Sequence, residues 1–134
     1  MGNIRKKKHG PEWHIQNAIR EYLTCREWRV ERFIGNALQF GIPDLYAFHR
    51  RHGERWIDVK TPGRYDFTQQ QKIKWPIWAD FNRGIWIMTA ADQENYDLLF
   101  DLPNWKKFWK KTWGVIPDIE TLLSQVAELD AAEE

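Results

Sequence analysis

Residues 41–60, GIPDLYAFHRRHGERWIDVK, contain two strand-like segments that are separated by a polar turn. The segments 45–49 and 55–60 hold most of the apolar side chains of this stretch, and the five residues between them include a glycine. This pattern predicts a β-hairpin. Asp58 and Lys60 would lie on one face of the second strand, about 6–7 Å apart along it, because alternate side chains share a face.

The segment before the hairpin predicts a helix followed by a first strand. Apolar residues recur at helical spacing over residues 11–26. Pro11 suits the first turn of that helix, where its missing N–H costs little. Residues 28–33 have the alternation of a strand.

The segment after the hairpin predicts a second helix and a buried strand. Thr68 and Gln71 have the spacing of a capping box, so the helix should begin near Thr68. Pro76 is expected to kink or break this helix, and Gly84 is expected to end it. The continuous apolar run 85–89 is typical of a buried strand.

The C-terminal third predicts two further helices. Asn104 is expected to cap the first of them and Gly114 to end it, and the second should open at residues 117–118. The first of these helices has an aromatic face that includes Trp105, Phe108 and Trp109. The element order is therefore α-β-β-β-α-β followed by two helices, which predicts an α/β fold with a mixed sheet.

Composition limits the class of protein. The chain has 134 residues, a single cysteine and a formal net charge of +1, and it contains no run of 18 apolar residues. These counts exclude an intrachain disulfide scaffold and predict neither a membrane span nor a signal peptide, so we expect a cytoplasmic protein. Residues 115–134 hold six acidic side chains and no Lys or Arg, which leaves a net charge of +7 on the other 114 residues. A basic body is compatible with nucleic-acid binding.

The charged residues of the hairpin indicate chemistry. Asp44 follows Pro43 at the start of the first hairpin strand, so it can approach Asp58 on the second. Two carboxylates brought close together repel each other and raise one pKa unless a cation lies between them. Hard oxygen ligands of this kind select Mg²⁺ or Mn²⁺ over thiophilic metals.

These residues also carry a resemblance to a known family. Gly41-Ile42-Pro43-Asp44 followed by Ile57-Asp58-Val59-Lys60 resembles the PD-(D/E)xK nuclease signature, with Asp rather than the commoner Glu at the third position. Glu12 and Gln71 resemble further positions of the VRR-NUC and Holliday-junction-resolvase-like branch. The similarity extends from about residue 12 to residue 91. It implies a restriction-endonuclease-like core over 11–100, preceded by a basic flexible arm (1–10) and followed by a helical extension (101–134) that packs on the core or on a partner subunit.

The resemblance implies a Mg²⁺-dependent endonuclease that cleaves branched or otherwise structured DNA, with Mn²⁺ as a substitute and no small-molecule cofactor. Asp44, Asp58 and the carbonyl of Val59 would hold the metal, and Glu12 would complete its shell or hold one of its waters. Glu12 has a simpler interpretation as a first-turn acid that is favoured by the helix dipole.

Two more side chains receive roles from the resemblance. Lys60 would orient the attacking water and stabilise the charge that develops on the phosphorane. Gln71 would position Lys60 or the water, although it is equally well explained as the capping partner of Thr68. Asp58 and Lys60 have their own simpler interpretation as an ion pair on an exposed sheet face.

Basic side chains are candidates for contacts with phosphates, which position a duplex without reading its sequence. They are Arg50, Arg51 and Arg55 at the hairpin turn, Arg64 beyond it, and Lys106, Lys107, Lys110 and Lys111 on the Lys-rich helix. Each of these groups has a simpler interpretation as ordinary solvent-exposed charge with no role in binding.

Two other functions fit the same sequence. The chain could be a nucleic-acid-binding module that keeps the nuclease fold without catalysis, or a structural protein that oligomerises through its Trp-rich helices. Symmetric cleavage of two strands requires a two-fold homodimer. The Trp-rich C-terminal third is a candidate for that interface, because Trp is enriched where subunits meet.

Overall fold

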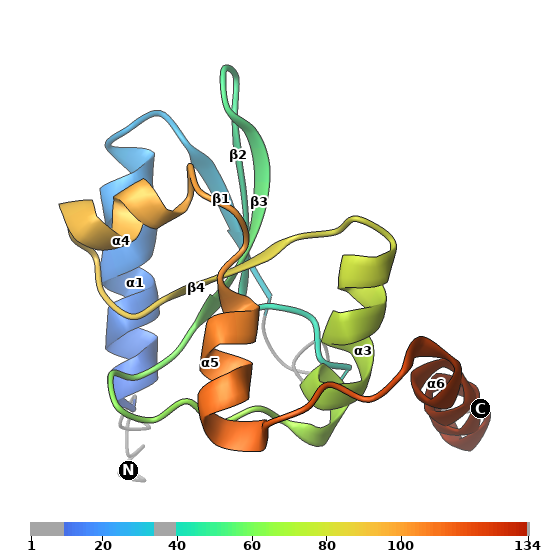
Figure 1. Ribbon diagram of the computed structural model, residues 1–134. Coiled ribbons are helices and arrows are strands. Elements are labelled where there is room, and N and C mark those ends of the chain that lie inside the picture. Colours follow the sequence, from blue (N-terminus) through green and yellow to red (C-terminus); the bar gives the residue numbers. More distant parts are fainter. Residues whose placement is uncertain (1–9, 34–39, 134) are drawn as a thin grey trace, which may run out of the picture.

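A four-stranded mixed sheet lies at the centre of the computed structural model, which describes residues 10–33 and 40–133. The strands β1 (Arg29–Arg32), β2 (Leu45–His49), β3 (Gly53–Val59) and β4 (Ile85–Met88) are arranged in sequence order (Figure 1). The first two pairings are antiparallel, and β3 and β4 are parallel. The α/β class with a mixed sheet is therefore confirmed, and the hairpin forms where the sequence predicts it.

Helices cover both faces of this sheet (Figure 1). Helix α1 (Pro11–Thr24) and the short α4 (Gln93–Leu98) lie on one side, and α3 (Gln69–Asp80) and α5 (Trp105–Trp113) lie on the other. Helix α6 (Ile119–Glu133) packs beside α3 at the edge of the molecule. Within the described residues, no helix has both the length and the apolar content that a membrane crossing requires.

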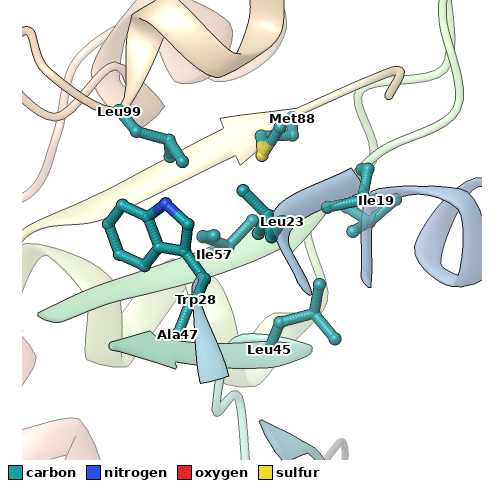
Figure 2. Packing of buried hydrophobic residues seen from close by; sticks show 9 residues of the cluster. Ile19, Leu23, Trp28, Leu45, Ala47, Ile57, Met88 and Leu99 are labelled. Atoms are coloured by element: carbon teal, nitrogen blue, oxygen red, sulfur yellow. The ribbon is translucent and has the colours of Figure 1, made fainter. Parts of the chain in front are cut away.

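Each face of the sheet has its own hydrophobic core. The core under α1 is mostly aliphatic (Figure 2), and its buried members are Ile19, Leu23, Trp28, Leu45, Ala47, Ile57, Val59, Met88 and Leu99. The core under α3 and α5 is mostly aromatic, and its buried members are Phe67, Trp75, Ile85, Ile87, Trp105 and Trp109. Part of the Trp-rich C-terminal third therefore packs on the sheet of its own chain.

Helix α3 differs from its prediction in two ways. It runs without a break from Gln69 to Asp80 with Pro76 inside it, so the predicted break is wrong. Trp75 and Pro76 are both buried, and this packing outweighs the roughly 3 kcal/mol that an internal proline costs. The helix also ends before Gly84, because Asn82 adopts a left-handed φ of 60°.

A short helix that the sequence does not predict, α4, follows β4. The Asp92 carboxylate caps it by accepting a hydrogen bond from the Asn95 N–H at 2.8 Å. The Asn95 side chain in turn accepts from the Thr89 N–H at 2.9 Å. The element depends on these capping contacts rather than on apolar periodicity, which six residues are too few to show.

Asn104 precedes α5, but its side chain does not cap that helix, which corrects the prediction. Its Oδ1 accepts from the Ile87 N–H at 2.6 Å, and its Nδ2 donates to the Ile87 carbonyl at 3.0 Å. The amide thus takes the place of a neighbouring strand on the free edge of β4. This pairing satisfies buried backbone groups and blocks the edge against other strands.

We expect Asn104→Ala to destabilise the fold by about 2–4 kcal/mol, because it leaves a buried N–H and a buried carbonyl without partners. Urea unfolding followed by circular dichroism would measure the change. Glu94→Ala, which truncates an exposed side chain on α4, is the control. Equal midpoints for the two variants would show that the Asn104 amide does not hold β4.

Candidate functional site

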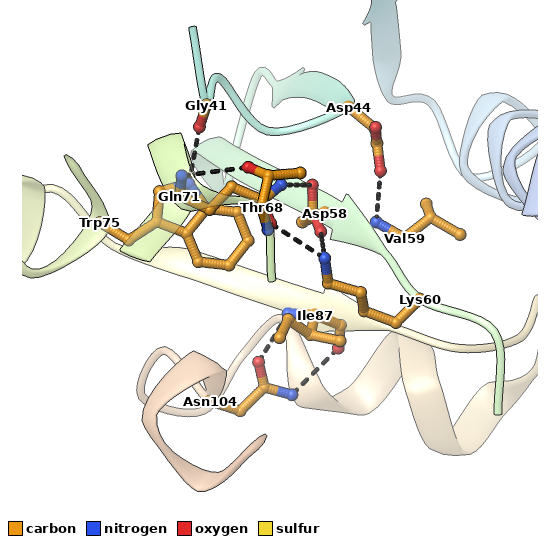
Figure 3. Close-up of polar contacts among 10 residues, drawn as sticks. All are labelled: Gly41, Asp44, Asp58, Val59, Lys60, Thr68, Gln71, Trp75, Ile87 and Asn104. Carbon is orange, nitrogen blue, oxygen red and sulfur yellow. Dashed lines mark hydrogen bonds and ion pairs between the residues drawn. The ribbon is translucent and has the colours of Figure 1, made fainter. Parts of the chain in front are cut away.

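The hairpin register brings Asp44 and Asp58 together. Leu45 pairs with Ile57 across β2 and β3, so one further residue along this antiparallel register places Asp44 opposite Asp58. The Asp44 Oδ2 atom accepts a hydrogen bond from the Val59 N–H at 2.8 Å (Figure 3). The chain therefore fixes one carboxylate at the open end of the hairpin, beside the other.

Lys60 follows β3 directly and is held by an ion pair. Its Nζ lies 3.0 Å from Asp58 Oδ2 and donates to Gln71 Oε1 at 3.1 Å (Figure 3). The ammonium also lies 4.9 Å and 5.6 Å from the ring centroids of Phe67 and Trp75. These rings add cation–π attraction and exclude water. The simpler interpretation of Asp58 and Lys60 as an exposed surface pair is wrong, because both residues are buried.

Gln71 connects helix α3 to this ion pair. Its Oε1 accepts from the Thr68 N–H at 3.1 Å, and its own N–H donates to Thr68 Oγ1 at 3.1 Å, which completes the predicted capping box. Its Nε2 lies 3.4 Å from Asp58 Oδ1. The capping interpretation of Gln71 is therefore confirmed, and the same side chain also contacts Lys60 and Asp58.

Gly41 and Trp75 fix the loop that leads to Asp44, and the sequence analysis gives neither residue this role. The Trp75 indole N–H donates to the Gly41 carbonyl at 2.7 Å. Gly41 has φ of +77°, and a Cβ at this position would lie 2.8 Å from the carbonyl carbon of Gln70. Only glycine fits this approach of the loop to α3. The glycine before the Pro-Asp pair was the available sequence signal.

The two aspartates create a desolvated site in which two carboxyl groups share one ammonium. Asp44 is 5% exposed and Asp58 is 1% exposed. Burial, followed by the charge of Asp58, raises the pKa of Asp44 to about 9, although the Val59 N–H opposes this shift. Burial also raises the pKa of Asp58, and Lys60 opposes it. One ammonium therefore does not neutralise both carboxylates.

Glu12 lies near enough to this site to respond to its charges. It belongs to the first turn of α1, where acidic side chains are favoured by the helix dipole. Partial desolvation and the charge of Asp58 raise the pKa of Glu12, and the charge of Lys60 lowers it. Glu12 is thus within range of the charges of Asp58 and Lys60, while its role at a metal stays a prediction.

The donor set fits a hard divalent cation that keeps part of its water. Asp44 and Asp58 supply adjacent carboxyl groups, and a cation beside them would favour the ionised form that burial and the charge of Asp58 disfavour at Asp44. Mg²⁺ commonly binds through one or two carboxylates and retains several waters. Among the described residues, no group of three or more His, Cys, Asp or Glu side chains is placed to hold a metal ion. Glu12 and the Val59 carbonyl remain predicted ligands.

The predicted phosphate-contacting residues are scattered. Arg50 and Arg51 are exposed at the closed end of the hairpin, about 20 Å from Asp44 by strand length. Arg55 is held by its own protein, because its Nε donates to the Leu99 carbonyl at 2.7 Å and its Nη1 donates to two further carbonyls. Arg64 is exposed in the turn that follows Lys60.

The remaining predicted contacts lie on α5. Lys106 and Lys107 are exposed there, opposite the buried faces of Trp105 and Trp109. The side chains of Lys110 and Lys111 lie outside the described part of the structure, as does the whole predicted arm up to residue 9. Of the predicted basic groups, Arg64 is therefore the one that directly follows the Asp58–Lys60 segment.

We expect the metal-free protein to lose stability as the pH rises from about 4 toward 9. The raised pKa of Asp44 means that the folded protein retains a proton that the unfolded chain has already released. This contribution is complete below the unfolded pKa and disappears as the pH passes the folded value. Thermal unfolding across this range would measure it.

Asp44→Asn and saturating Mg²⁺ should each flatten that pH dependence. The first removes the titrating group, and the second favours the ionised form. Asp66→Asn, which neutralises an exposed carboxylate between β3 and α3, should leave the wild-type slope intact. A wild-type slope that persists in Asp44→Asn would contradict the proton assignment.

Any functional interpretation of this site depends on its geometry and on the sequence pattern. No family model, no curated protein and no solved structure matches the chain.

Proposed function

We propose that the protein is a divalent-metal-dependent endonuclease of the PD-(D/E)xK kind, with the restriction-endonuclease-like core that its sequence resembles. The observation that carries this proposal is the convergence of Asp44, Asp58 and Lys60 at the open end of one hairpin. If these residues had only a structural role, burying three ionisable groups would lower the stability of the fold with no compensating benefit. A divalent cation bound for catalysis would neutralise the second carboxylate, which Lys60 alone does not.

Each side chain has a task that its contacts support. Asp44 and Asp58 would hold Mg²⁺ or Mn²⁺, and the Val59 N–H keeps the Asp44 carboxylate in place. The metal would polarise a phosphate oxygen and acidify a water. Asp58 and Gln71 occupy two of the N–H directions of the Lys60 ammonium, which leaves one for the attacking water or a phosphate oxygen.

The preorganisation of Lys60 is the strongest catalytic feature. An ammonium in a nearly dry site stabilises developing negative charge far better than one in water. The contacts with Asp58, Gln71 and two aromatic rings keep Lys60 in one position before the substrate arrives. Glu12 would hold a water of the metal shell from the side of α1.

The proposed substrate is branched or otherwise structured DNA, and this part of the proposal comes from the family resemblance. A symmetric cut in such a substrate would require two copies of the chain. Trp105 and Trp109 are buried against their own sheet, which weakens the Trp-rich helix as the dimer interface. The proposed homodimer therefore needs another surface.

Nuclease assays with labelled linear duplex, single strand and four-way junction would test the proposal. We expect cleavage in Mg²⁺ or Mn²⁺ and none in EDTA. Asp44→Asn and Lys60→Met should each lower the cleavage rate by about 100-fold or more, because each removes charge stabilisation in the transition state. Lys60→Met keeps most of the side-chain volume against Phe67 and Trp75.

Asp66→Asn is the matched control, since it removes a nearby but exposed carboxylate. Undiminished cleavage by Asp44→Asn or Lys60→Met would place the chemistry elsewhere or identify a contaminating nuclease. Binding of all three DNAs without cleavage in either metal would favour the non-catalytic module. Absence of binding together with a large assembly in light scattering would favour the structural protein.

A further inference from the structure

Arg20 on α1 lies close enough to Arg32 on β1 for its charge to act on Arg32, and Arg32 responds in the same way to the charge of Asp44. Val30 packs against the core under α1, so Arg32, two residues later on the strand, points to the same side. The Arg32 guanidinium lies 5.4 Å from the ring centroid of Trp13 on α1. Arg20 lies seven residues after Trp13 and hence on the same face of the helix.

These guanidinium groups have buried donors without acceptors. Arg32 Nε and Nη2 and Arg20 Nε are buried and have no hydrogen-bond partner. Among the described residues, no carboxylate lies within 4.0 Å of either guanidinium. Buried polar groups are normally paired, and an unpaired charged donor costs more than a neutral one. Within residues 10–33 and 40–133, these three donors therefore lack an acceptor, and an anion from outside the protein is the partner that fits them.

The charges around Arg32 place the pair beside the candidate site. Burial lowers the pKa of Arg32, the charge of Arg20 lowers it further, and the charge of Asp44 raises it. Arg32 is also directly linked to the site along the sheet, since its partner across β1 and β2 is Leu45, the residue after Asp44. The arginine pair and the carboxylates are thus neighbours of opposite charge.

A groove that Arg20 lines, and that Arg32 does not line, offers open space next to one member of the pair. Its volume is about 330 Å³, and it runs between α1 and β1, with Asn17 and Arg20 on the helix and Val30 on the strand. Glu21 and Cys25 also line it. A phosphate group with its attached sugar enters an open groove of this kind more readily than it enters a closed cavity.

We propose that Arg20 and Arg32 together bind a backbone phosphate of the nucleic-acid strand, next to the phosphodiester bond that lies at Asp44 and Asp58. Guanidinium forks match phosphate oxygens in shape and charge, and two forks can share one phosphate. Identifying the anion as nucleic acid rests on the proposed nuclease function. The strand would then continue from the hairpin end into the groove between α1 and β1.

The first test uses inorganic pyrophosphate and does not depend on cleavage. We expect millimolar pyrophosphate, compared with chloride of equal ionic strength in EDTA, to raise the wild-type Tm by at least about 2 °C. Arg20→Gln and Arg32→Gln should each lose this rise. Arg29→Gln should retain it, because Arg29 lies on the opposite face of β1 and its guanidinium is exposed and paired with Glu31.

The second test measures binding of a fluorescent duplex in EDTA at several salt concentrations. We expect Arg20→Gln and Arg32→Gln each to weaken binding and to reduce the slope of log K against log salt by about 1, as the loss of one phosphate contact does. Arg29→Gln removes the same charge from the same strand and should change the slope less. Circular dichroism would verify that each variant is folded. If Arg32→Gln does not fold, Arg20→Gln alone still decides the test.

The two proposals fail in different ways. A wild-type enzyme that cleaves DNA, combined with unchanged pyrophosphate and salt responses in both arginine variants, would overturn the phosphate site and leave the nuclease function intact. Arg-dependent DNA binding without cleavage would support the phosphate site and overturn the nuclease function. A pyrophosphate effect that depends on the arginines without any DNA binding would assign the pair to another anion and overturn the nucleic-acid inference.

Discussion

The buried ion pair of Asp58 and Lys60 is the interaction on which the rest of the site depends. Both groups are removed from water, and such a pair is stable only when further hydrogen bonds satisfy it. Gln71 supplies these contacts because the capping box fixes its side chain at the start of α3. A local helix-capping motif therefore positions a helix, and that helix positions an ammonium on a strand.

The second carboxylate follows from the hairpin rather than from the helix. Antiparallel register brings Asp44 opposite Asp58, and the Val59 N–H holds it there. The Trp75 hydrogen bond to Gly41 then couples the loop before Asp44 to α3. Helix α3 thus supports both halves of the site.

The predictable features are those with short-range causes. The capping box of Thr68 and Gln71 and the hairpin strands are encoded within a few residues, and the structure has them where the sequence predicts them. Pro76 and Asn104 could not be interpreted in the same way, because tertiary packing and a β4 edge decide their roles. The neighbouring charges of Arg20 and Arg32 come from a helix and a strand whose relative placement no local pattern specifies.

The charges of the candidate site lower the stability of the folded chain when no ligand is bound. Without a cation, two buried carboxyl groups share a site with one ammonium, and burial, followed by the charge of Asp58, raises the pKa of Asp44. Three buried donors of Arg20 and Arg32 have the opposite problem, since they lack an acceptor among the described residues. A metal ion at the aspartates and a phosphate at the arginines would relieve both at once. Under the two proposals, a nucleic-acid backbone bound together with its metal would supply both charges in one complex, so one ligand would satisfy the carboxylates and the arginines.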